Sequence, residues 1–121
     1  MNKEVKIIGN ELYMNDKSVA FSSEISKFIV SGDVVVVLLK IPQGKKITID
    51  DCLNLYGLNF NGEIIWQVEL VSKGLSSQFQ YSPIVNIAET DDKQLIAVDF
   101  MGRRFEVNKY TGQMTISGFT K

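Results

Sequence analysis

Two segments of the chain share one pattern of residue types, and this internal repeat constrains the fold more than any other feature. The segments are Tyr56–Trp66 and Phe105–Ile116. Each begins with an aromatic residue, passes through an asparagine into a turn that ends in glycine, and continues as an apolar strand. Glycine at the end of such a turn supplies a backbone conformation that other residues resist. The repeat therefore predicts two equivalent hairpins, and it describes a scaffold rather than a chemical site.

Outside the repeat, apolar and polar residues alternate with a period of two, and Gly, Asn or Asp interrupts them every few residues. This pattern is typical of antiparallel hairpins. Val34–Leu39 is an unbroken apolar run, which predicts a strand buried on both faces. We therefore predict one all-β domain over residues 1–121, an antiparallel meander of about ten short strands. Only Ser22–Lys27 would tolerate a helical turn.

Two polar segments, Pro42–Asp51 and Ser72–Ser82, interrupt the meander and are predicted to be long loops, the first with a possible short strand at Ile47–Ile49. The pair Asn61–Gly62 predicts a type I′ turn, in which both central residues take a positive φ. On the strand that follows, Trp66 lies on the apolar face, so we expect it in the core rather than at a contact surface.

The first copy of the repeat, with its Leu55-Tyr-Gly-Leu-Asn59 run followed by Gly62 and Trp66, resembles a blade hairpin of the quinoprotein-like and WD-like β-propeller families. The second copy lacks the tryptophan. A third and weaker copy runs from Leu12 to Phe21 without the glycine. The resemblance implies topology only, because no residue matches a cofactor ligand of the quinoprotein enzymes. It implies a partial propeller, an oligomer that closes a ring, or a sandwich of similar hairpins.

The amino-acid composition excludes several classes of function. Histidine is absent and Cys52 is the single cysteine, which removes His-dependent catalysis and thiolate zinc sites. We therefore expect no enzyme activity, no cofactor and no metal, and an inert thiol at Cys52. The net charge of −1 offers no field for nucleic acid or for an acidic membrane. The single cysteine and the charged N-terminal residues favour a cytoplasmic protein without a signal peptide.

Seven residues are candidates for binding a partner protein. The acidic ones lie in two predicted turns or loops, where the alternative is simple solvation. The aromatic ones lie in the second long loop, where they either anchor a partner or pack onto the sheet. The candidates are Asp50, Asp51, Phe79, Tyr81, Glu89, Asp91 and Asp92. By contrast, Arg103 and Arg104 are predicted to protect a charged strand edge against aggregation.

These exclusions favour a non-enzymatic protein-binding domain. In its class, a small, cytoplasmic, slightly acidic β domain resembles the immunity proteins that bind and neutralise bacterial toxins, and the acidic residues would then face a basic toxin. One alternative is a structural or oligomerising module of propeller type. A second alternative is a hydrolase that uses carboxylates. The sequence leaves the partner and the oligomeric state open.

Overall fold

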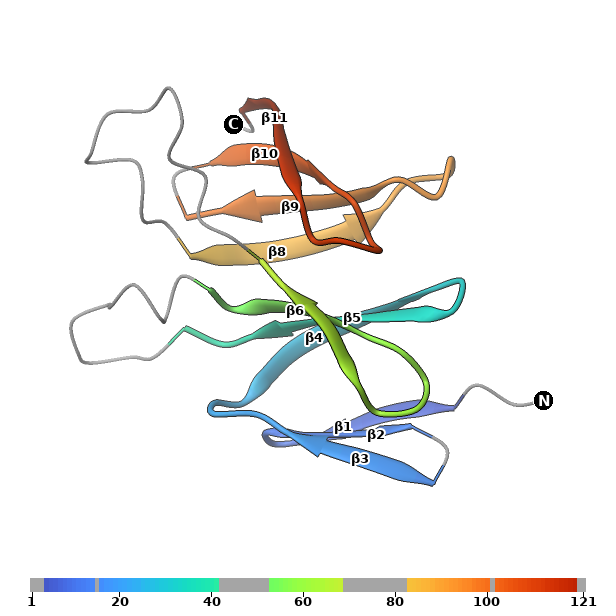
Figure 1. Cartoon of the computed structure of the whole chain (residues 1–121). Helices are drawn as coiled ribbons and strands as arrows, with labels where there is room; N and C mark the ends of the chain where they lie inside the picture. Colours follow the sequence, from blue (N-terminus) through green and yellow to red (C-terminus); the bar gives the residue numbers. More distant parts are fainter. Residues whose placement is uncertain (1–3, 15, 42–52, 69–82, 101, 120–121) are drawn as a thin grey trace.

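The protein is all-β. The computed structural model describes residues 4–14, 16–41, 53–68, 83–100 and 102–119, and of residues 117–119 only the backbone. These residues form eleven short strands in three antiparallel sheets and contain no helix (Figure 1). The predicted fold class is therefore confirmed, with one strand more than the expected ten. The segment that would tolerate a helical turn does not form one, because residues 22 and 23 form a bend and the next strand begins at Ile25.

Each sheet is a meander in which strands that follow one another along the chain are hydrogen-bonded neighbours. The first sheet consists of β1 (Val5–Ile8), β2 (Glu11–Met14) and β3 (Lys17–Ala20). The middle sheet consists of β4 (Ile25–Ser31), β5 (Val34–Leu39), β6 (Leu55–Leu58) and β7 (Ile64–Gln67). The last sheet consists of β8 (Ile84–Glu89), β9 (Leu95–Asp99), β10 (Arg103–Val107) and β11 (Met114–Phe119).

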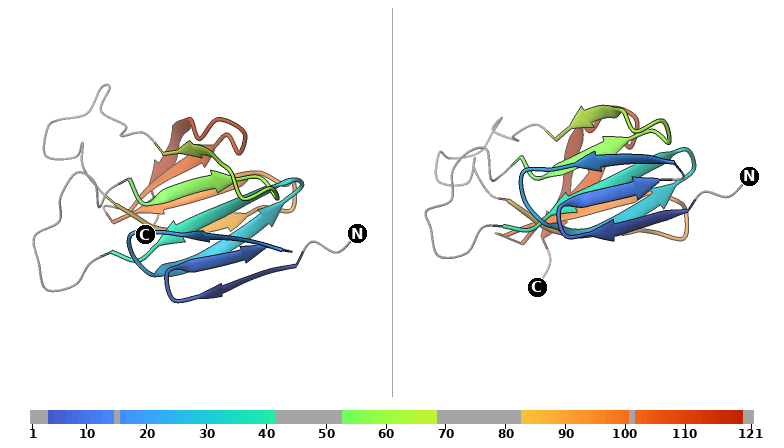
Figure 2. Two further views of the ribbon diagram at one scale, coloured as in Figure 1. Left: turned by 60° about the horizontal axis from the view of Figure 1, so that its bottom comes forward. Right: turned by 90° about the horizontal axis from the view of Figure 1, so that it is seen from below.

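The three sheets are stacked with the middle sheet between the other two (Figures 1 and 2). Two hydrophobic clusters hold the stack together. The first junction, between the first and middle sheets, contains Leu12 and Met14 from β2 and Leu58 from β6. The second junction, between the middle and last sheets, contains Leu55, Leu95 and other residues of both sheets. The described residues show a stack of three sheets and no closure of a propeller ring.

Strand β5 belongs to both junctions. Successive side chains of a strand point to opposite faces of the sheet. Val34, Val36 and Leu38 accordingly enter the second junction, while the three residues between and after them enter the first. All six side chains of β5 are buried. The unbroken apolar run thus marks the central strand of the stack, as the sequence predicts.

The two repeated segments form the hairpins β6–β7 and β10–β11, and they are equivalent in detail. The Oδ1 atoms of Asn59 and Asn108 each accept a backbone hydrogen bond from the residue two positions later, at 3.0 and 2.9 Å. Gly62 and Gly112 follow with φ of 83° and 78°. Asn61 does not share the positive φ, so the predicted type I′ turn is wrong. The Asn59 carboxamide instead caps a longer turn.

Trp66 connects the two repeated hairpins. Its indole packs in the second junction and is 6% exposed, as predicted for a core residue. The Nε1 atom donates a hydrogen bond of 2.6 Å to the carbonyl oxygen of Lys109, in the turn of the second hairpin. The ring lies so close to Gly57 and Gly112 that a Cβ atom there would come within 2.2 and 2.5 Å of it. Through Trp66, the two repeated hairpins therefore pack into one another and connect the middle sheet to the last sheet.

Candidate functional site at the turn end

Three turns meet at one end of the last two sheets, and we call this region the turn end. They are the β4–β5 turn after Ser31, the β8–β9 turn after Glu89, and the β10–β11 turn that contains Lys109. Ser31 Oγ donates a short hydrogen bond to Glu89 Oε2 and accepts one of 3.0 Å from Lys109 Nζ. The Trp66–Lys109 hydrogen bond holds the third turn from its other side. The turn end is therefore braced by side chains from both sheets.

The β8–β9 turn presents two of the predicted site residues to solvent. Asp91 and Asp92 are exposed at its tip. Thr90 closes the turn, because its amide donates to Gln94 O at 2.9 Å and its Oγ1 accepts from Gln94 N at 3.1 Å. The two carboxylates thus project from a well-bonded hairpin, as a docking surface requires.

The third residue of this tip, Lys93, has an unusual backbone conformation. Its φ is 66°, and it is the one described residue other than glycine with a positive φ. Glycine occupies this kind of position in five other turns of the described residues, for example at Gly32 and Gly112. A side chain here costs roughly 1 kcal/mol of conformational energy. Lys93 thus places an ammonium group at the turn end in spite of the conformational energy that its positive φ costs.

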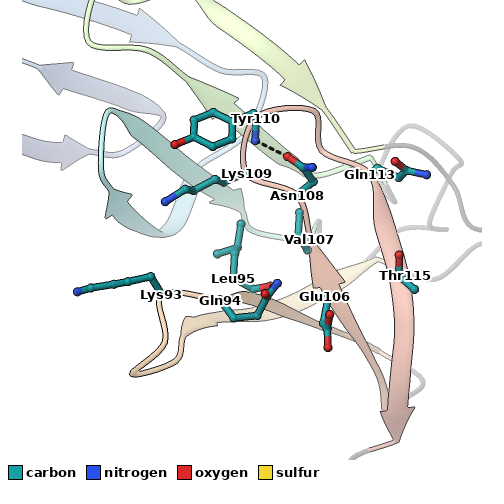
Figure 3. A pocket seen from close by; sticks show the side chains of 10 residues that line it. All are labelled: Lys93, Gln94, Leu95, Glu106, Val107, Asn108, Lys109, Tyr110, Gln113 and Thr115. Atoms are coloured by element: carbon teal, nitrogen blue, oxygen red, sulfur yellow. Dashed lines mark hydrogen bonds between the residues drawn. The ribbon is translucent and has the colours of Figure 1, made fainter.

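A pocket of about 380 Å³ opens between the β8–β9 and β10–β11 turns (Figure 3). Its walls are mostly polar, and Lys93, Glu106 and Gln113 are among the residues that line it. Tyr110 stands at the same pocket with 58% of its surface exposed. Lys109 Nζ lies 5.5 Å from the centre of the Tyr110 ring, which orients the two side chains together.

The predicted site residues have different fates in the structure. Asp91 and Asp92 are exposed together on one turn. Glu89 is close to them in the chain, but its carboxylate is bonded to Ser31 and braces the turn end. The other four candidates, Asp50, Asp51, Phe79 and Tyr81, lie outside the described residues, as does Cys52.

Sequence reasoning missed the remaining members of the turn end. Asp33 is exposed in the β4–β5 turn, two positions after Ser31. With it, the acidic side chains of the turn end outnumber its two lysines, Lys93 and Lys109. Tyr110 is an exposed aromatic side chain at the turn end, whereas the sequence predicts such an anchor in the second long loop. The sequence does contain a signal for Lys109 and Tyr110. They lie in the part of the turn where the two copies of the repeat differ.

The predicted charged edge at Arg103 is wrong. β10 lies between β9 and β11, and Arg103 is 3% exposed. Its Nε donates to Asp99 Oδ2 at 2.6 Å, and its backbone amide donates to Asp99 Oδ1 at 2.8 Å. Such a buried pair is stable only while both partners are present. Arg103 Nη1 is also buried, and its N–H groups have no hydrogen-bond acceptor among the described residues.

On the first sheet, the Tyr13 hydroxyl donates a short hydrogen bond to Glu11 Oε1. This bond to the neutral phenol raises the pKa of Tyr13 above its ordinary value. Both residues lie on the outer face of the sheet, away from the turn end. In the described part of the chain, no three Cys, Asp or Glu side chains gather in a way that would hold a metal ion. No helix of membrane-spanning length and hydropathy occurs in that part either.

Comparison with protein families places almost the whole chain in one of them. A family model described as domain of unknown function DUF7957 matches residues 2–119. The chain belongs to this family. No curated protein and no solved structure matches it significantly. Membership of the DUF7957 family thus covers all three sheets, and the function has to be argued from the molecule itself.

Proposed function

We propose that this DUF7957 protein is a non-enzymatic binding protein of the immunity type, which neutralises a basic partner protein through its turn end. The observation that supports this most is the pair of exposed carboxylates, Asp91 and Asp92, on a hairpin that is closed by its own hydrogen bonds and braced against the middle sheet. A preformed surface loses little conformational entropy on binding. Acidic groups on such a surface also accelerate association with a basic partner.

Tyr110 gives this surface an anchor. Tyrosine is enriched among the residues that dominate binding energies, because it offers a large apolar face and a polar hydroxyl. Its exposed ring stands beside the pocket of about 380 Å³, into which a partner side chain would fit. Three charged side chains line the same pocket, Glu106 together with Lys93 and Lys109, so a basic side chain of the partner would meet one carboxylate beside two ammonium groups.

The test is affinity capture from the native cytoplasm, followed by binding measurements with the purified partner. Asp91→Lys combined with Asp92→Lys should abolish capture of a basic protein. The control is Asp16→Lys combined with Glu4→Lys, which makes the same charge change at two exposed residues that flank strands of the first sheet. Capture should weaken with rising salt concentration, because exposed charges are screened. Recovery of no protein partner, or equal capture by both double variants, would contradict the proposal.

A structural module that closes a ring with further copies is the alternative. Ring closure by stacking would bury the outer face of the first sheet. That face carries Lys6, Tyr13 and Ser18, which pair across β1, β2 and β3. It also carries Glu11, which pairs with Ile8 and Ala20. Burying such polar side chains against another sheet costs free energy. The polar face therefore supports the binding protein over the stacked ring, and light scattering that finds no monomer would reverse this preference.

A further inference from the structure

The first sheet is one strand shorter than the other two. Within residues 4–14, 16–41, 53–68, 83–100 and 102–119, the middle and last sheets have four strands each, whereas the first has three. The internal repeat identifies the missing position. The hairpins β6–β7 and β10–β11 are the third and fourth strands of their sheets, and the third copy of the repeat, from Leu12 to Phe21, covers β2 and β3. The first sheet thus lacks the counterpart of β4 and β8, which would pair with β1.

In the second junction this position is filled. β8 lies against β4, and Lys27 Nζ on β4 donates to Ile87 O on β8 at 2.8 Å. The β4 side chain that faces this way, Ile29, packs against the cluster to which Ile84 and Ile87 of β8 belong. The first strand of the last sheet, β8, therefore covers the apolar face of β4, the first strand of the middle sheet.

In the first junction the same position is open among the described residues. In the part of the chain that the structure describes, β1 is paired only with β2, so one edge of its backbone has no neighbouring strand there. On β4, Phe28 and Val30 pair with Val37 and Val35 and hence face this junction. Phe28 is only partly buried and Val30 is 36% exposed. Among the described residues, the first junction thus contains both a partly exposed apolar strip on β4 and the unpaired edge of β1.

We propose that the free edge of β1 and the strip Phe28–Val30 form an acceptor site for an extended segment of a partner protein, which adds a fourth strand to the first sheet. Strand addition of this kind draws affinity from backbone hydrogen bonds and specificity from alternate side chains. The inference rests on the proposed function only in taking the donor to be a partner protein. The acceptor site itself follows from the incomplete sheet.

The filled positions define the chemistry of the donor. β4 has seven residues and β8 has six, and each directs apolar side chains toward the neighbouring sheet. Each is also the last strand of its sheet on this side. The position therefore takes one strand with nothing beyond it. Every described strand is already paired, so a second copy would bring a whole sheet, whereas a single extended segment fits.

The probe is a dye-labelled peptide with the sequence of residues 83–90, which contains β8. Fluorescence anisotropy should show that it binds the wild-type protein and that Val30→Glu weakens binding by about ten-fold or more, because a carboxylate would be buried under the added strand. The control Val85→Glu changes an apolar side chain of similar exposure on the last sheet and should bind as the wild type does. A peptide with serine in place of its two facing isoleucines should not bind.

A second readout needs no variant. On the wild-type protein, the peptide should shift the amide resonances of residues 5–8 and of Val30 more than those of β11. Absence of peptide binding, equal binding by Val30→Glu and Val85→Glu, or shifts confined to other strands would each overturn the acceptor site. A wild-type dimer that Val30→Glu converts to a monomer would overturn the assignment to a partner, because a second copy would then occupy the position. The capture experiment at Asp91 and Asp92 stays independent of all these outcomes.

Discussion

The two junctions of the stack bury similar apolar side chains but differ in how they are fastened. The second junction has polar connections at several depths. Trp66 is hydrogen-bonded to Lys109, and Ser31 is hydrogen-bonded to Glu89. The buried Asn54 carboxamide makes hydrogen bonds of 2.8–3.0 Å to Leu39 O and to the backbone of Ile84. Directional hydrogen bonds of this kind fix the relative position of two sheets, which apolar contact alone does not do.

The first junction depends mainly on apolar packing. Phe21 and Tyr56 contribute a ring pair with centroids 5.1 Å apart. The connection from the first sheet to β4 adds backbone bonds, such as Ile25 N to Gly9 O at 2.9 Å. No other described strand pairs with the second edge of β1, and Val30 is partly exposed. The comparison shows that the sheets are joined by side-chain hydrogen bonds where the turn end is presented, and that a strand position is open, among the described residues, where a strand can be added.

The largest effect should come from closing the space around Trp66. Gly57→Ala would place a Cβ atom 2.2 Å from the indole, which has no room to move inside the cluster. We expect a loss of about 3 kcal/mol in the free energy of unfolding, measured by urea denaturation. The matched control is Gly9→Ala, where nothing lies within 4 Å and only the φ of 61° opposes the side chain. It should cost about 1 kcal/mol, and equal losses would contradict the packing of Trp66 between the two hairpins.

The next effect separates the two faces of β4. Ile29 faces the closed second junction and Val30 the open first one. Ile29→Glu should lower the free energy of unfolding by about 2 kcal/mol, because it buries a charge, whereas Val30→Glu should cost less than about 1 kcal/mol. Thermal unfolding followed by circular dichroism measures both. A Val30→Glu variant as unstable as Ile29→Glu would show that the first junction is closed.

A smaller effect should follow from removing a single polar contact. Trp66→Phe keeps an aromatic ring but loses the Nε1 donor to Lys109 O, and we expect a loss of about 1.5 kcal/mol. The counterpart in the first junction is Tyr56→Phe, which removes a hydroxyl that accepts a 3.0 Å bond from the exposed Gln67. That loss should be about 0.5 kcal/mol. Chemical denaturation decides, and the reverse order would contradict the account.

The smallest effect concerns the outer face of the first sheet. Glu11→Gln removes the carboxylate that raises the pKa of Tyr13, so this pKa should fall toward its ordinary value of 10.0. In the folded protein the phenol holds its proton to higher pH than in the unfolded chain. Its contribution to stability is therefore present below the unfolded pKa and is lost as the pH rises through the folded pKa. Ultraviolet titration measures the shift, and an unchanged pKa would remove the hydrogen bond from the account.

Local patterns predicted most of the fold. The apolar run of β5, the core position of Trp66 and the turns that end at Gly62 and Gly112 follow from side-chain period and from backbone sterics. Arg103 was misassigned because its partner, Asp99, becomes its neighbour only when the β9–β10 hairpin forms. The type I′ prediction at Asn61 failed because the carboxamide of a neighbouring residue, two positions earlier, decides the turn.

The candidate site was less predictable than the fold. Asp91 and Asp92 were identified because acidic residues in a turn are visible in the sequence. The bracing of the turn end depends on Ser31, Glu89 and Lys109, which come from three hairpins and carry no local signal. The open edge of β1 was equally hidden, since it appears only when the three sheets are compared strand by strand.

The central claim, that the first sheet lacks one strand, is tested most directly by amide hydrogen exchange in the protein without any peptide. Residues along an edge strand point their amides alternately to the neighbouring strand and to the open side. The account predicts that about half of the β1 amides exchange rapidly, while those of the central strand β5 are protected throughout. Slow exchange of all β1 amides would contradict it, because the position beside β1 would then already be filled.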